Sequence, residues 1–104
     1  MTEKKATSKK EAALKALRDE FSGNDAGTQR VRLKEAFKRF VTLTTLEIRR
    51  WLDILHPAGR VRELRHEGLD IVTFRKAEET EAGVKHSVGQ YVYRPDGGKS
   101  GAPS

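Results

Sequence analysis

Apolar residues recur at helical spacing along the first two thirds of the chain. In the segment at about 8–22, an apolar face follows Ser8-Lys9-Lys10-Glu11, which has the pattern of a capping box, and this face consists of Ala13, Leu14, Leu17 and Phe21. A second amphipathic segment runs from Thr28 to Phe40, with Leu33, Ala36 and Phe37 on one face and basic residues, Arg32 among them, on the rest. We therefore predict two helices joined by the polar linker 22–27, the second with a basic exterior.

Two further helices are predicted from their start and stop signals. Thr44-Thr45-Leu46-Glu47 has the pattern of a capping box, and Asp53 tolerates the left-handed backbone of the tight turn that would end this helix. Pro57 is favoured at the first position of the next helix, and Gly68 supplies its stop after about Glu67. Between the helix at 28–40 and the helix that follows Thr44, the β-branched Val41 and Thr42 with Leu43 indicate only a break in the helical pattern.

After Gly68 the apolar period changes from that of a helix to about two. Residues 69–75 and 84–93 alternate in this way, which predicts two strands. The connection 76–83 is polar and lacks core residues, so we expect a β-hairpin with an extended loop.

Three helices followed by a hairpin, with the turn 53–56 between the second and third, are typical of a winged helix-turn-helix. We therefore predict an α+β fold whose DNA-binding domain, at 28–94, has a three-helix core and a β-hairpin wing. An extra amphipathic helix lies in a flexible basic arm at 1–27, and a disordered tail follows at 95–104.

Charge and composition narrow the function classes. The chain has 104 residues with 21 Lys and Arg against 15 Asp and Glu, and the net charge of +6 favours a polyanionic partner. With no Cys, the sequence offers no disulfide, no thiolate nucleophile and no zinc-finger or iron–sulfur ligand set. No apolar run is long enough to cross a membrane, so we expect a cytoplasmic protein without membrane contact.

Candidate DNA contacts follow from the groove-binding geometry of this fold. The helix from Pro57 would enter the major groove, where Arg62 suits a guanine edge and Gly59 permits close backbone approach. The preceding helix and the wing would reach phosphates. The predicted DNA-binding residues are Thr44, Thr45, Arg49, Arg50, His56, Ala58, Gly59, Arg60, Arg62, Glu63, His66, Arg75, Lys76 and Lys85. For Arg60 and Arg65, structural ion pairing is an equally good reading.

No catalytic site is predicted. The sequence has no GxGxxG or Walker pattern, and the three His match no metal-ligand spacing. We therefore expect no enzymatic activity, catalytic residue, cofactor, metal or small-molecule substrate.

The stretch TTLEIRRWLDILHPAGRVRELRHEGLDIVT resembles the helix-turn-helix domain of small bacteriophage and prophage DNA-binding proteins. The shared pattern is carried by Thr45, Leu52, Ile54, Arg60, Val61, Leu64, Arg65, Gly68 and Ile71, and Lys85-His86-Ser87 is similar to the family's wing strand. Asp53 departs from the usual turn glycine, and Ile48 from a common small residue. The resemblance implies a winged helix that binds double-stranded DNA.

We expect a sequence-specific DNA-binding regulator of phage or prophage, associated with the host nucleoid. A recombination or replication accessory protein would look the same at this level, and a protein-interaction module is the competing class. Structured RNA is a third possibility, without an aromatic RNA-binding motif to support it. The N-terminal segment has two readings: Lys4, Lys5, Lys9 and Lys10 form a basic arm on DNA, or the Leu14 and Leu17 face pairs with its copy in a homodimer.

Overall fold

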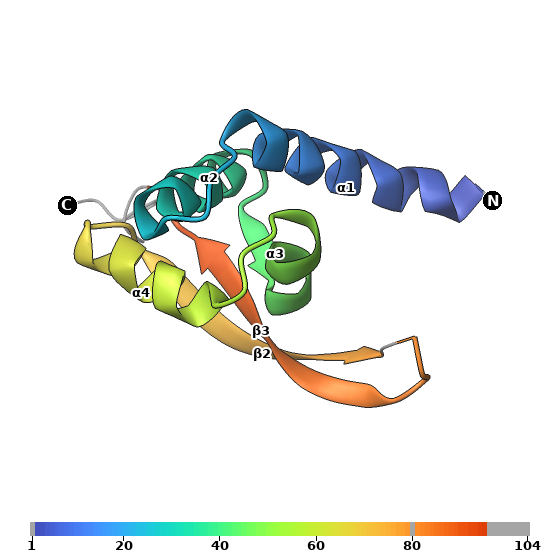
Figure 1. Ribbon diagram of the computed structural model, residues 1–104. Helices are drawn as coiled ribbons and strands as arrows, with labels where there is room; N and C mark the ends of the chain where they lie inside the picture. The colour runs from blue at the N-terminus through green and yellow to red at the C-terminus, as the bar shows by residue number, and fades with distance from the viewer. Residues whose placement is uncertain (1, 80, 96–104) are drawn as a thin grey trace, which may run out of the picture.

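The computed structural model describes residues 2–79 and 81–95, with backbone only for 2–8. Figure 1 shows the arrangement, in which four helices lie against one end of a twisted hairpin whose far end projects beyond them. The elements are α1 (Thr2–Glu20), α2 (Ala26–Arg39), β1 (Thr42–Thr44), α3 (Thr45–Trp51), α4 (Pro57–His66), β2 (Ile71–Glu79) and β3 (Lys85–Tyr93). The predicted α+β class, with helices followed by a hairpin, is confirmed. Most of the predicted tail at 95–104 lies outside the described residues.

The sheet is antiparallel, with strand order β1-β3-β2. Its strand β1 corrects the interpretation of 41–43 as a mere break: Leu43 pairs with Tyr91, about half the chain away, and a three-residue strand leaves little local signal. The predicted loop at 76–83 is also wrong, because the β2–β3 ladder continues to Glu79 opposite Lys85. Backbone pairing holds the two strands together there even though their side chains are polar.

The core draws on every helix and on the sheet. Its fully buried members include Leu14 and Leu17 of α1, Phe37 of α2, and Val61 and Leu64 of α4. The α1 leucines therefore lie against the chain's own core, which corrects their assignment to a homodimer contact: a second copy cannot reach that face. The helix also begins at Thr2 rather than at about residue 8.

Lys10 is held by contacts within the protein and is not part of a free basic arm. Its ammonium donates to the Thr42 carbonyl at 3.0 Å, pairs with Glu47 at 3.0 Å and lies 5.6 Å from the centre of the Phe40 ring. These contacts hold the middle of α1 against β1 and α3.

The predicted helix starts and stops are present at the α3–α4 unit. Thr44 and Glu47 form a capping box, in which the Thr44 hydroxyl accepts from the Glu47 amide at 3.1 Å and the Glu47 carboxylate accepts from the Thr44 amide at 3.0 Å. Asp53 adopts φ +56°, and Gly68 adopts φ +106° after α4. Asp25, which was placed in the linker, caps α2, and hydrogen bonds from Thr28 lower the pKa of its carboxyl group.

Arg32 is the largest correction in the helical part. It was assigned to the basic exterior of α2, yet only 1% of its surface is exposed. Its Nη1 donates to the carbonyls of Phe21 at 2.6 Å and Gly23 at 3.2 Å, and its Nη2 donates to the carbonyl of Asp53 at 3.4 Å. Burial lowers the pKa of Arg32, with Asp53 opposing the shift, but the guanidinium remains protonated at neutral pH. One side chain thus joins the end of α1, the linker and the α3–α4 turn.

We expect Arg32→Met to lower the free energy of unfolding by about 2 to 3 kcal/mol, because the three carbonyls lose their donor while the side-chain volume is nearly kept. Arg39→Met at the exposed end of α2 is the matched control and should change stability by less than about 0.5 kcal/mol. Urea denaturation followed by circular dichroism measures both. Equal stability of the two variants would contradict the structural role of Arg32.

Candidate nucleic-acid interface

A groove of about 580 Å³ lies between α3, the start of α4 and the hairpin. It brings together several of the predicted DNA-binding residues from three separate stretches of sequence: Thr45, Arg49, His56, Ala58, Gly59 and Arg75. The remaining lining comes from Leu46, Pro57, Ser87, Val88, Gly89 and Tyr91. The groove is therefore open between a helix N-terminus and an antiparallel ribbon.

The junction of α3 with β3 forms the floor of this groove. The Thr45 hydroxyl donates to the Gly89 carbonyl at 3.3 Å. A Cβ on residue 89 would lie 3.0 Å from the Thr45 Oγ1 and 3.4 Å from the Tyr91 hydroxyl, so the close approach of helix and strand favours glycine there. The sequence prediction missed Gly89, Tyr91 and Ser87 as groove residues. A glycine inside a predicted strand was the available signal.

The turn between α3 and α4 sets the other wall. Asp53 reverses the chain with its left-handed backbone, and the Arg49 Nε donates to the Leu55 carbonyl at 3.2 Å. Pro57 is buried at the start of α4, preceded by His56 as N-cap residue without a side-chain capping bond. The His56 imidazole is therefore free of helix capping and lies at the groove.

Helix α4 has three distinct sides around its buried Val61 and Leu64. Its outward side carries Gly59, Arg62 and His66; Arg62 and His66 are exposed, and a Cβ on residue 59 would meet nothing within 4 Å. Toward the hairpin, Arg65 donates from Nε to the Ile71 carbonyl at 2.8 Å and from Nη2 to the Thr73 hydroxyl at 2.6 Å. The third side faces α2.

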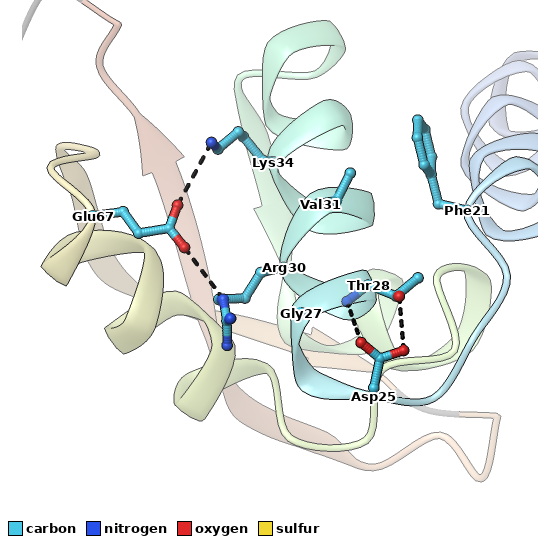
Figure 2. Close-up of a pocket in the computed structure, with 8 residues that line it drawn as sticks. All are labelled: Phe21, Asp25, Gly27, Thr28, Arg30, Val31, Lys34 and Glu67. Atoms are coloured by element: carbon cyan, nitrogen blue, oxygen red, sulfur yellow. Dashed lines mark hydrogen bonds and ion pairs between the residues drawn. The ribbon is translucent and has the colours of Figure 1, made fainter.

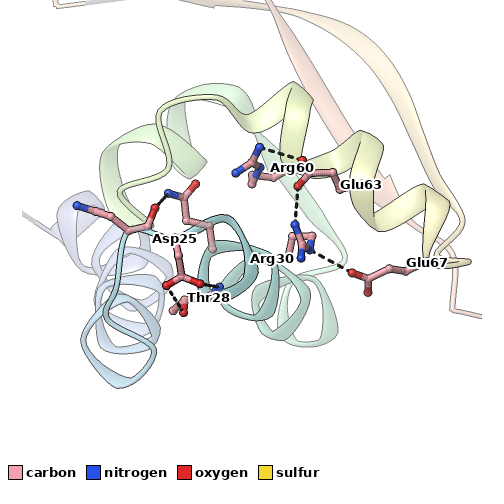
Figure 3. Close-up of polar contacts among 8 residues, drawn as sticks. Asp25, Thr28, Arg30, Arg60, Glu63 and Glu67 are labelled. Carbon is pink, nitrogen blue, oxygen red and sulfur yellow. Dashed lines mark hydrogen bonds and ion pairs between the residues drawn. The ribbon is translucent and has the colours of Figure 1, made fainter.

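On the side that faces α2, the predicted contacts Arg60 and Glu63 belong to an ion-pair cluster (Figure 3). Arg60 Nη2 lies 3.0 Å from one Glu63 carboxylate oxygen, and Arg30 Nη1 of α2 lies 3.0 Å from the other. These two residues are therefore engaged within the protein and turned away from Arg62.

Other predicted contacts also lie apart from the groove. Thr44 is buried with its hydroxyl engaged in the cap, so its assignment as a phosphate contact is corrected. Arg50 lines a different hollow together with Glu47, Glu78 and Glu79. In the hairpin, Lys76 lies 3.8 Å from Glu78, and Lys85 is directly opposite Glu79. The far part of the wing therefore mixes charges of both signs.

The outward side of α4 and the adjoining groove form a cationic side of the molecule. Within the described part of the chain, Arg49, Arg62 and Arg75 have no carboxylate partner. The carboxylates of α4, in contrast, are paired with cations of α2 and of α4 itself. The outward side of α4 and the adjoining groove thus present arginines without competing acids, which suits a polyanion.

A family model described as a winged helix-turn-helix domain matches residues 28–94. The chain belongs to this family. A search of curated proteins and a search of solved structures found no match. By their order in the chain, α3 and α4 correspond to the helix-turn-helix of this winged-helix protein, and β2 with β3 to its wing. The second helix of this motif, here α4, is by convention called the recognition helix.

Two further properties of this winged helix-turn-helix protein concern the residues that the structure describes. Among them, no helix has the length and apolar character needed to cross a bilayer. Nor do three or more His, Asp or Glu side chains of that part gather as potential metal ligands.

Gly59 gives a test of whether the recognition helix itself requires a glycine. We expect Gly59→Ala to raise the free energy of unfolding by about 0.5 to 1 kcal/mol, because the new methyl enters open space and alanine favours the helix. Gly68→Ala is the matched control: it also meets open space, but its φ of +106° should make the change destabilising by about 1 to 2 kcal/mol. Thermal denaturation measures both, and destabilisation by Gly59→Ala would contradict the geometry of α4.

Proposed function

We propose that this protein binds double-stranded DNA sequence-specifically, with α4 in the major groove and the hairpin along the phosphate backbone. Membership of the winged helix-turn-helix family supports DNA binding. The observation that carries the finer proposal is the outward side of α4, where Arg62 and His66 are exposed beside a glycine with open space above it. A glycine without a side chain, next to the long cationic side chain of Arg62, allows the helix to approach base edges closely.

The contacts divide into two kinds. Arg62 extends from the outward side and suits the paired acceptors of guanine, while Gly59 allows the helix to sit deep in the groove. The cleft between α4 and the wing takes the backbone of one strand, with Arg49 and Arg75 directed at its phosphates and Thr45 and His56 as hydrogen-bonding groups. The first kind reads sequence and the second supplies affinity and register.

The biological use that fits this activity best is transcriptional regulation in a phage or prophage, acting at the nucleoid in the host cytoplasm. The similarity of the α3–α4 stretch to phage DNA-binding proteins supports this, and DNA binding of the same kind also serves recombination or replication. The function needs no catalytic step, cofactor or metal. If the protein forms a homodimer, it must use a surface other than the one that contains Leu14 and Leu17.

A protein-interaction module is the second candidate. Leu55 at the α3–α4 turn is 69% exposed, and Phe21, which follows α1, and Val31 of α2 line a hollow that extends to Glu67 at the end of α4 (Figure 2). Apolar surface of this kind serves protein partners. Fluorescence anisotropy with duplexes selected from a random library decides between the two: the absence of binding even at low salt contradicts the DNA proposal.

Arg62→Ala should weaken binding to a selected duplex by about 1 to 3 kcal/mol and leave binding to random duplex nearly unchanged, because the lost contact is to a base edge. Anisotropy titrations on the two duplexes measure the ratio of affinities. An equal loss on both would show that Arg62 contacts phosphate and not a base.

Arg75→Ala should weaken binding to selected and random duplexes alike and reduce the slope of log affinity against log salt by about 0.9, since one phosphate contact is lost. Lys85→Ala serves as the comparison within the wing. Lys85 lies opposite Glu79, so we expect its removal to reduce the slope by less. A larger effect at Lys85 than at Arg75 would place the backbone contact at the far end of the wing.

A further inference from the structure

Two carboxylates lie beside the outward side of the recognition helix, Glu63 within α4 and Glu67 at its C-cap. Glu63 and Glu67 are one turn apart, and they are the acidic residues of this segment between Pro57 and Gly68. Helix geometry puts Glu63 next to Arg62 and one turn after Gly59, so both of its neighbours lie on the side proposed to face DNA. A glutamate that turned outward there would stand beside the phosphates that border the major groove.

Each carboxylate is instead held by cations of α2. Arg30 Nη1 lies 3.0 Å from Glu63, and its Nε lies 3.2 Å from Glu67, so one guanidinium joins both carboxylates (Figure 3). Lys34, one turn further along α2, lies 3.5 Å from the second oxygen of Glu67, as Figure 2 shows. Arg60 completes the cluster at 3.0 Å from Glu63.

The cluster is half-buried in the cleft between the two helices. The exposed fractions of the side chains are 30% for Arg30, 38% for Lys34 and Glu63, and 42% for Glu67. Solvent screening is weaker for such groups than for fully exposed ions, and one guanidinium in a fork between two carboxylates restricts the rotamers of both. The ion pairs therefore fix the direction of the two glutamate side chains and also neutralise their charge.

We infer that Arg30 and Lys34 of α2 are positioning residues for DNA binding, which hold the carboxylates of Glu63 and Glu67 away from the nucleic acid and cancel their charge. The inference rests on the proposed DNA-binding function. Neither cation needs to touch DNA in this role. Their effect passes through the recognition helix: Arg30 shares Glu63 with Arg60 of the same helix, and Arg30 and Lys34 hold Glu67.

The test compares DNA affinity among variants of equal net charge. Arg30→Met/Lys34→Met removes both α2 cations. Adding Glu63→Gln and Glu67→Gln removes the two carboxylates that have lost their α2 partners, of which Glu63 keeps Arg60 as a neighbour, and restores the net charge of the wild type. Adding Asp19→Asn and Glu35→Gln instead restores the same net charge at positions on α1 and α2 outside the cluster. Lys38→Met/Arg39→Met controls for the loss of two cations elsewhere on α2.

At about 100 mM salt we expect the Arg30→Met/Lys34→Met variant to bind both selected and random duplex about fivefold to tenfold more weakly than the wild type. The variant with Glu63→Gln and Glu67→Gln should return to within about twofold, whereas the variant with Asp19→Asn and Glu35→Gln should not. Lys38→Met/Arg39→Met should lose about twofold or less. Circular dichroism checks the fold of each variant.

Equal rescue by the two neutralising pairs would overturn the inference, because net charge alone would then explain binding. Failure of Glu63→Gln and Glu67→Gln to rescue a folded variant would overturn it as well. Arg30→Met and Arg30→Met/Glu63→Gln form a smaller series that decides the question if the double variant does not fold. Absence of DNA binding by the wild type would instead overturn the proposed function, and the inference with it.

Discussion

The buried guanidinium of Arg32 is the interaction on which the arrangement of the helices depends. It donates to carbonyls at the end of α1, in the linker and at Asp53, three places that share no other single partner in the described structure. A buried guanidinium without acceptors is costly, so the arrangement that brings the three carbonyls to Arg32 is favoured. The same side chain therefore joins the end of α1, whose Leu14 and Leu17 lie in the core, to the α3–α4 turn.

The candidate site lies next to that turn. With Asp53 held, α3 and α4 cross at a defined place, and the Thr45–Gly89 hydrogen bond brings the hairpin against the start of α3. The groove between them therefore consists of residues distant in sequence whose relation depends on backbone contacts. Arg65 adds a second connection, from the recognition helix to the first residues of β2. The recognition helix is thus fixed on its α2 side by ion pairs and on its hairpin side by hydrogen bonds.

Helix caps and turns could be predicted from the sequence, whereas contacts between residues far apart in the chain could not. The capping box of Thr44, the left-handed Asp53, Pro57 and Gly68 were predictable because each acts within a few residues of itself. Strand β1 depends on β3, and the burial of Arg32 depends on carbonyls from other segments, so neither leaves a periodic signal. In the candidate site, Arg62, His66 and Gly59 were placed outward by helix geometry alone. The pairing of Glu63 with Arg30 was not predicted, because Arg30 lies far from it in sequence.

The net charge of the protein differs from the charge that a ligand meets at any one surface. An excess of six positive charges over the whole chain does not locate a binding surface, because many of the cations are engaged internally: Lys10 by Glu47, Arg32 by carbonyls, and Arg30 by two glutamates. What distinguishes the outward side of α4 is that its arginine is free of acids while the acids of the same helix are paired elsewhere. A helix of alternating charge in the sequence thereby becomes a helix with one cationic side in the fold. Under the proposed function, this sorting of charge by tertiary contacts gives α2, none of whose residues lines the groove, an indirect role in DNA binding.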